Sequence, residues 1–96
     1  MKYRDFLSLH ILHHASEGPV TGSFLMRELE RHGYRISPGT MYPLLHSLER
    51  EGLLKSHWEV KDGKRVRVYE ITETGRRTLD EGKERLRELC LELLGE

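Results

Sequence analysis

Three histidines near the start of the chain have the residue type and spacing that a metal site needs. His10, His13 and His14 stand at i, i+3 and i+4, so on a helix their rings can converge on one face. Neutral imidazole is a common ligand of zinc and related transition metals. The same segment is dense with apolar residues, and histidines interleaved in that way are more often surface or interface residues. We therefore predict no cofactor, and keep a metal-sensing regulator that uses these histidines as an alternative.

Basic residues form the second chemical group. Lys61, Lys64 and Arg65 flank the pair Asp62-Gly63, which is a strong signal for a two-residue hairpin turn. A basic hairpin tip suits contact with DNA phosphates or insertion into a minor groove. Lysines are also ordinary at solvated turns, so these residue types permit DNA binding without requiring it.

The other reactive side chains give no catalytic pattern. The single cysteine, Cys90, cannot form an intrachain disulfide, which suits the cytoplasm, and we expect it to pack on the apolar side of the last helix. Trp58 is expected to pack in a strand, with stacking on a flat apolar effector as the alternative. The sequence has no phosphate-binding glycine loop, HExxH motif or nucleophile elbow, so no enzyme is predicted.

Length and charge set broad limits. The 96 residues correspond to one small domain, which would gain burial from an oligomer. No apolar stretch is long enough to span a bilayer, and the first residues lack the pattern of a signal peptide. The net charge is zero, but residues 53–71 have five Lys/Arg against three acids, and residues 72–96 have five against seven. Such a division can separate a binding face from an assembly face.

Apolar periodicity and breaker residues predict three helices in the first half of the chain. The first covers residues 3–15. The second follows a Thr21 cap and ends at Gly33, and the third covers residues 38–51. The second and third helices, joined by a short turn, are a candidate helix-turn-helix.

Two strands and one helix complete the predicted chain. Residues 54–60 and 65–71 show strand alternation on either side of the hairpin turn, and a helix follows the Thr72 cap to about residue 94. This order predicts an α+β, mainly helical fold. It is a winged helix-turn-helix of three helices and a two-stranded wing, plus a C-terminal dimerisation helix.

Two parts of this single compact domain are expected to have different tasks. We assign residues 1–71 to the winged helix-turn-helix that binds DNA. Residues 72–96 form the dimerisation helix.

Two motifs then resemble a known family. The first, SPGTMYPLL at residues 37–45 continued by LEREGLL at residues 48–54, closely resembles the third-helix signature of PadR-like transcriptional regulators. The second, YEITETGR at residues 69–76, resembles the strand-to-helix junction of the same family. The resemblance covers nearly the whole chain, and the Tyr-Pro step inside a helix makes the first motif specific. It implies a DNA-binding regulator.

Two departures limit what the resemblance carries over. The family often has His-Gly-Tyr at the head of the second helix, where this chain has Thr21-Gly22-Ser23, so no role of that histidine or tyrosine is transferred. The tail over residues 72–96 resembles the compact subfamily with a single C-terminal helix.

A helix-turn-helix places the N-terminal part of its recognition helix against base edges in the major groove. The predicted DNA contacts on and before the third helix are Arg35, Ser37, Thr40, Tyr42 and His46, and those on the wing are Lys61, Lys64 and Arg65. Hydroxyls near a helix N-terminus suit phosphates, whereas His46 suits a base. The alternative is that Ser37 and Thr40 only cap the helix and that Tyr42 only packs.

Specificity from so small a module implies two copies on a palindromic site. The predicted dimer interface lies on the last helix, with help from the first, and comprises Phe6, Leu79, Gly82, Leu86, Leu89, Cys90 and Leu93. The alternative is that the last helix only folds back on its own domain.

The sequence thus predicts a cytoplasmic homodimer that binds double-stranded DNA, with repression preferred over activation and a small-molecule effector possible. A winged-helix module for protein–protein assembly is the competing class of function.

Overall fold

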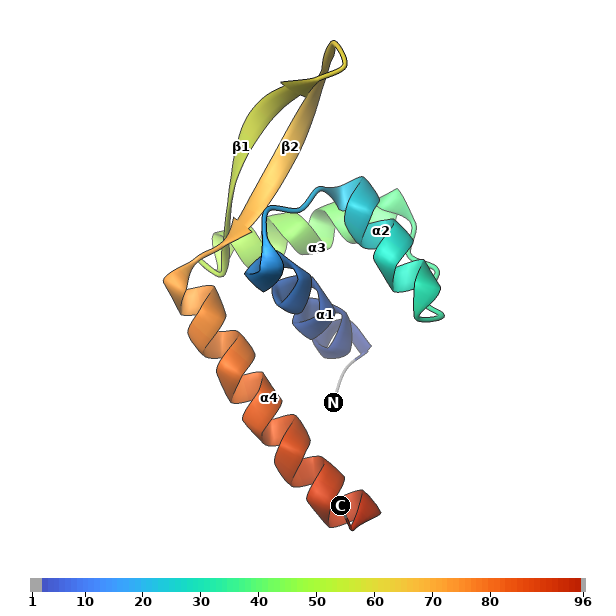
Figure 1. Ribbon diagram of the computed structural model, residues 1–96, viewed down its shortest axis with the longest axis vertical. Coiled ribbons are helices and arrows are strands. Elements are labelled where there is room, and N and C mark those ends of the chain that lie inside the picture. The colour runs from blue at the N-terminus through green and yellow to red at the C-terminus, as the bar shows by residue number, and fades with distance from the viewer. Residues whose placement is uncertain (1–2, 96) are drawn as a thin grey trace.

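A computed structural model describes residues 3–95, with four helices and one antiparallel hairpin in the predicted order (Figure 1). The fold class expected from the sequence is confirmed. Each predicted strand is one residue longer at the turn, and the first helix extends two residues further. The elements are α1 Tyr3–Glu17, α2 Gly22–Arg31, α3 Pro38–Arg50, β1 Leu54–Lys61, β2 Lys64–Ile71 and α4 Glu73–Leu94.

Side-chain caps start two of the helices. The Thr21 hydroxyl accepts a hydrogen bond from the Phe24 amide at 3.1 Å, and the Thr72 hydroxyl accepts one from the Gly75 amide at 3.0 Å. Such caps satisfy backbone donors that a helix leaves unpaired. Ser37 precedes α3 without a side-chain cap, and α3 runs without a break through Pro43.

The hairpin stands out from the helical body as a wing (Figure 1). Asp62 and Gly63 have φ angles of 51° and 75°, the left-handed values that a type I′ turn requires at both central positions. The strand register runs from Leu54 opposite Ile71 to Lys61 opposite Lys64, so the two lysines end the hairpin.

The base of the wing is fixed to the helical body. Val20, between α1 and α2, exchanges two backbone hydrogen bonds with Tyr69 of β2, at 2.9 and 2.8 Å. The core lies where α1, α2 and α3 meet the base of the hairpin. It includes the fully buried residues Ile11, Leu12, Leu25, Leu29, Met41, Leu45, Leu54 and Tyr69.

The helix α4 packs against α1 and then continues past it (Figure 1). Leu79 is 4% exposed in the core, and a Cβ at Gly82 would lie 2.4 Å from a methyl group of Leu9. The close approach at Gly82 is therefore made within the chain. No helix within residues 3–95 combines the length and the apolar character of a membrane span.

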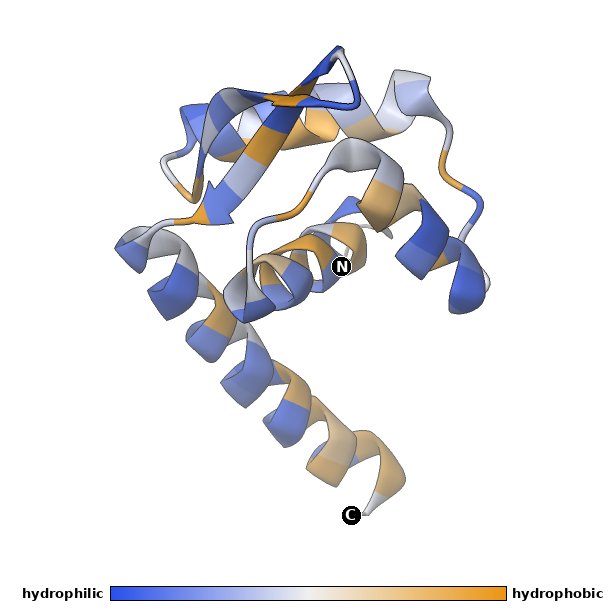
Figure 2. Ribbon diagram, turned by 45° about the horizontal axis from the view of Figure 1, so that its top comes forward, coloured by the Kyte–Doolittle hydropathy of each residue, from blue (hydrophilic) through white to orange (hydrophobic). Residues whose placement is uncertain are grey.

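The same face of α4 is uncovered further along. Leu89 is 36% exposed and Leu93 is 69% exposed, and Cys90 between them is exposed as well. Figure 2 shows the hydrophobic colour continuing along α4 to its C-terminal end. Phe6 and Leu86 line a hollow of about 250 Å³ between α1 and α4.

Gly75, in the first turn of α4, has the least room for a side chain among the glycines that the structure describes. A Cβ at this position would lie 2.2 Å from the Leu53 carbonyl oxygen and 2.8 Å from Ile71. That carbonyl also accepts a hydrogen bond from the Thr72 amide at 3.1 Å, so it is held in place.

We expect Gly75→Ala to destabilise the fold by about 3 kcal/mol, since the methyl group must displace backbone rather than a flexible side chain. Urea denaturation followed by circular dichroism measures the change. Gly39→Ala is the matched control, because its Cβ would have only the Ser37 hydroxyl at 3.7 Å and alanine favours a helix. Equal stability of the two variants would contradict the close packing described for Gly75.

Candidate nucleic-acid interface

A groove of about 500 Å³ lies between the N-terminus of α2, the exposed side of α3 and the wing. Three predicted DNA contacts, Tyr42, His46 and Arg65, line it together. The structure therefore brings residues that are 23 positions apart in the chain onto one concave surface. The other lining residues are Thr21, Gly22, Ser23, Trp58, Val66, Arg67 and Tyr69.

Tyr42 lies across the start of α2. A Cβ at Gly22 would be 2.6 Å from Cε1 of the Tyr42 ring and 2.9 Å from its hydroxyl oxygen. Glycine is therefore the residue that allows the ring to lie there, while 37% of Tyr42 stays exposed to solvent. The side chain both packs and presents a hydroxyl, so packing and ligand contact are compatible at this position.

Arginine and tryptophan stack on the wing. The Arg65 guanidinium carbon lies 4.5 Å from the centre of the Trp58 ring, and that of Arg67 lies 5.4 Å away. Trp58 is 53% exposed, so it packs in its strand against these two guanidinium groups and not in the interior. Stacking on an aromatic face orients a guanidinium without neutralising it.

A polar cluster joins the wing to α3. The Glu49 carboxylate accepts hydrogen bonds from the Ser56 amide at 3.0 Å and from Arg67 at 3.2 Å. Arg67 also donates to the Ser56 hydroxyl at 2.9 Å. These contacts connect α3, β1 and β2 and fix the angle at which the wing leaves the body.

Tyr69 forms the floor of the groove. Its hydroxyl is buried, and among residues 3–95 it has no hydrogen-bond partner. Burial raises the pKa of this phenol, while the charge of Arg67 acts in the opposite direction. The hydroxyl therefore stays protonated at neutral pH and is a donor without an acceptor.

Arg67 and Trp58 are site residues that the sequence predictions omitted. A sequence pattern could have identified both residues, because Arg65 and Arg67 alternate on one side of β2 and Trp58 stands directly opposite Arg67 in the register. To pair Trp58 with Arg67 from that pattern, one must know the exact strand register, which depends on the length of the turn.

The remaining predicted contacts lie outside the groove. Lys61 and Lys64 are exposed at the wing tip. Thr40 lines a separate hollow beside α1, together with Arg4 and Arg50, two further basic residues that the sequence predictions omitted.

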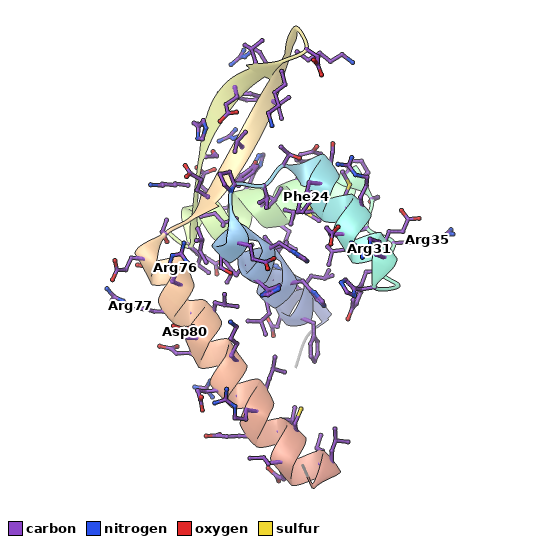
Figure 3. The ribbon with its side chains drawn as sticks, in the orientation of Figure 1. Phe24, Arg31, Arg35, Arg76, Arg77 and Asp80 are labelled. Carbon is purple, nitrogen blue, oxygen red and sulfur yellow. The ribbon has the colours of Figure 1, made fainter. Side chains whose placement is uncertain are left out.

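Two contacts lie at the turn between α2 and α3. Ser37 and Arg35 line a hollow there, and Arg35 points away from the wing (Figure 3). The Ser37 hydroxyl lies 3.5 Å from that of Thr40 and forms no helix cap, so the alternative that Ser37 serves only as a cap is not supported.

The three histidines of α1 differ in their burial and in their neighbours. His13 is exposed, and His14 packs towards α2, with its ring 6.1 Å from that of Phe24. The His10 ring lies 5.7 Å from the ring of His32, which follows α2. Burial and the neighbouring histidines lower the pKa of His10. None of these residues lines the groove at α3.

Comparison with known proteins gives one consistent result. Residues 11–81 match the model of the transcriptional regulator PadR-like family. The chain is 53% identical over 92 residues to the transcriptional regulator Rv3488 of Mycobacterium tuberculosis, an alignment that covers 96% of this chain and 86% of that protein.

Solved structures agree with this match. A PadR family transcriptional regulator from Eggerthella lenta is 36% identical and superposes with a TM-score of 0.81, covering 91% of this chain and 77% of the other. A PadR-like transcriptional regulator from Bacillus cereus is 28% identical, with a TM-score of 0.84 and coverages of 93% and 88%.

Proposed function

The chain belongs to the PadR-like family of transcriptional regulators, and from that premise we propose that it is a cytoplasmic repressor that binds a palindromic operator as a homodimer. The observation that carries the proposal is the groove in which Tyr42 and His46 of α3 face the stacked Arg65 of the wing. An exposed helix face beside a basic hairpin is the arrangement with which winged helices bind duplex DNA.

The parts of the groove have different tasks. His46 and Tyr42 lie on the exposed side of α3, where base edges of a major groove are within reach. Arg65 and the tip residues Lys61 and Lys64 contact phosphates or enter the adjacent minor groove. Thr40 and Ser37 contact the phosphates on the far side of α3.

Pairing places two copies of this surface on one duplex. The uncovered apolar face of α4, with Leu86, Leu89, Cys90 and Leu93, packs against its symmetry mate, and Phe6 of α1 extends the contact. Leu79 and Gly82 act indirectly, because they hold α4 against its own α1. The two α3 helices then lie about 34 Å apart, one turn of DNA. An effector that shifts the α4 pair would change this separation and release the operator.

The direct test is selection of bound fragments from the genomic DNA of the source organism, followed by a salt titration of the fragment that is most enriched. We expect an inverted repeat in the enriched sequences, and binding that weakens steeply as salt rises, because phosphate contacts release counterions. Enrichment of no fragment, or binding that salt leaves unchanged, would contradict the proposal and favour a protein–protein assembly module.

A further inference from the structure

The side chain of His14 is 11% exposed and lies between α1 and α2. Its Nε2 atom is buried, and among residues 3–95 it has no hydrogen-bond partner. Its Nδ1 atom lies 3.6 Å from a carboxylate oxygen of Glu17. A carboxylate on the Nδ1 side favours the neutral tautomer with its proton on Nδ1, which leaves the lone pair of the ring on Nε2. The buried nitrogen is thus prepared to be an acceptor or a metal ligand.

Two further ligand side chains meet His14 from the next helix and its C-terminal cap. Ligand atoms of His14, Glu28 and His32 all lie within 4.8 Å of one another. Glu28 and His32 are one helical turn apart, which brings both side chains to the same face. Glu28 accepts a hydrogen bond from Arg31 through Oε1, and a carboxylate has a second oxygen for a cation.

We propose that His14, Glu28 and His32 form a binding site for a divalent transition metal ion such as Zn²⁺. Two imidazoles and one carboxylate are a familiar set of protein ligands for zinc, in which the fourth position is open. A water molecule would complete the coordination of a bound ion, and the His10 ring, 5.7 Å from that of His32, is a further imidazole beside the cluster. Glu17 is a positioning residue that orients His14.

A competing triad shares one of these residues. Ligand atoms of His13, His14 and Glu17 also lie within 4.8 Å of one another. His13 and Glu17 are both exposed, and the three residues belong to one helix. The triad of His14, Glu28 and His32 is favoured because it joins two segments of the chain and because two of its members, His14 and Glu28, are partly buried. A cation held there also links α1 to α2 and raises the melting temperature.

The measurement is calorimetric titration of the full-length protein, first freed of metal by a chelator, with Zn²⁺ as the probe. We expect one ion per chain and a higher melting temperature with zinc. We also expect no binding of Mg²⁺, which prefers oxygen ligands and retains its water. Titration with Co²⁺ gives the visible absorption of a tetrahedral site as a second readout. Failure of Zn²⁺ to bind the intact protein would overturn the proposal, whatever the protein does with DNA.

Variants identify the ligands. We expect His32→Ala and Glu28→Gln to weaken zinc binding more than about 100-fold and Glu17→Gln to weaken it about tenfold, as an outer-shell partner does. His57→Ala and Glu30→Gln are matched controls, with exposed side chains outside the cluster, and should bind zinc as the unchanged chain does. His32 is itself exposed, so its loss leaves the fold intact. Unchanged binding by His32→Ala, together with loss of binding in His13→Ala, would overturn the assignment.

Discussion

Replacing Lys64 and Arg65 together by alanine should lower the affinity for the operator at least about tenfold and make its salt dependence less steep by about four per dimer. The wing carries these charges on a rigid type I′ hairpin, and Arg65 is held over Trp58 at 4.5 Å. Among residues 3–95, no salt bridge neutralises Arg65, whereas Arg67 is paired with Glu49. The charge of Arg65 is therefore available to a phosphate.

The measurement is fluorescence anisotropy of a labelled operator at several salt concentrations. Arg76→Ala with Arg77→Ala is the control, since it removes the same charge from α4, away from the wing (Figure 3). If the control flattens the salt dependence as much as the wing variant does, the effect arises from net charge and the wing has no special contact with DNA.

Leu89→Glu should convert the proposed dimer to a monomer at micromolar concentration and lower operator affinity at least about 100-fold. The substitution places two like charges in an apolar seam. In a dimer, binding of one subunit to its half-site holds the second subunit at a high effective concentration near the other half-site. A monomer loses this advantage. Leu89 is 36% exposed in the single chain, so the variant keeps its fold, which circular dichroism checks.

Analytical ultracentrifugation gives the molar mass, and anisotropy gives the affinity. Leu91→Glu is a closely matched control, because Leu91 is 54% exposed two residues further along and lies on a different face of the helix. A monomeric Leu91→Glu beside a dimeric Leu89→Glu would place the interface on another face of α4.

Local features of the sequence were sufficient to predict the elements. The caps at Thr21 and Thr72, the Asp62-Gly63 turn and the apolar period of α3 depend on residues within a few positions of one another. The interactions that start, stop and turn a chain are short in range. The fold class followed from the order of these elements, because few arrangements bury a helix pair, a hairpin and a further helix together.

Tertiary contacts determined which residues come together in each site. The sequence predicted Arg65 as a DNA contact but not its partner Trp58. It predicted both Thr40 and Tyr42 as DNA contacts, and only the structure shows that they line different hollows. It also predicted Gly82 as a point of approach between two chains, whereas the close neighbour is Leu9 of the same chain.

The histidines of α1 show most clearly the difference between what the local sequence determines and what tertiary packing determines. The chain by itself determined that His10, His13 and His14 would lie on a helix, since helical spacing is a property of neighbouring residues. Only the packing of α2 against α1 brought Glu28 and His32 to His14. Helix packing depends on side chains distant in sequence, which fit together only once the core has formed. The same physical reason holds for the groove between α3 and the wing.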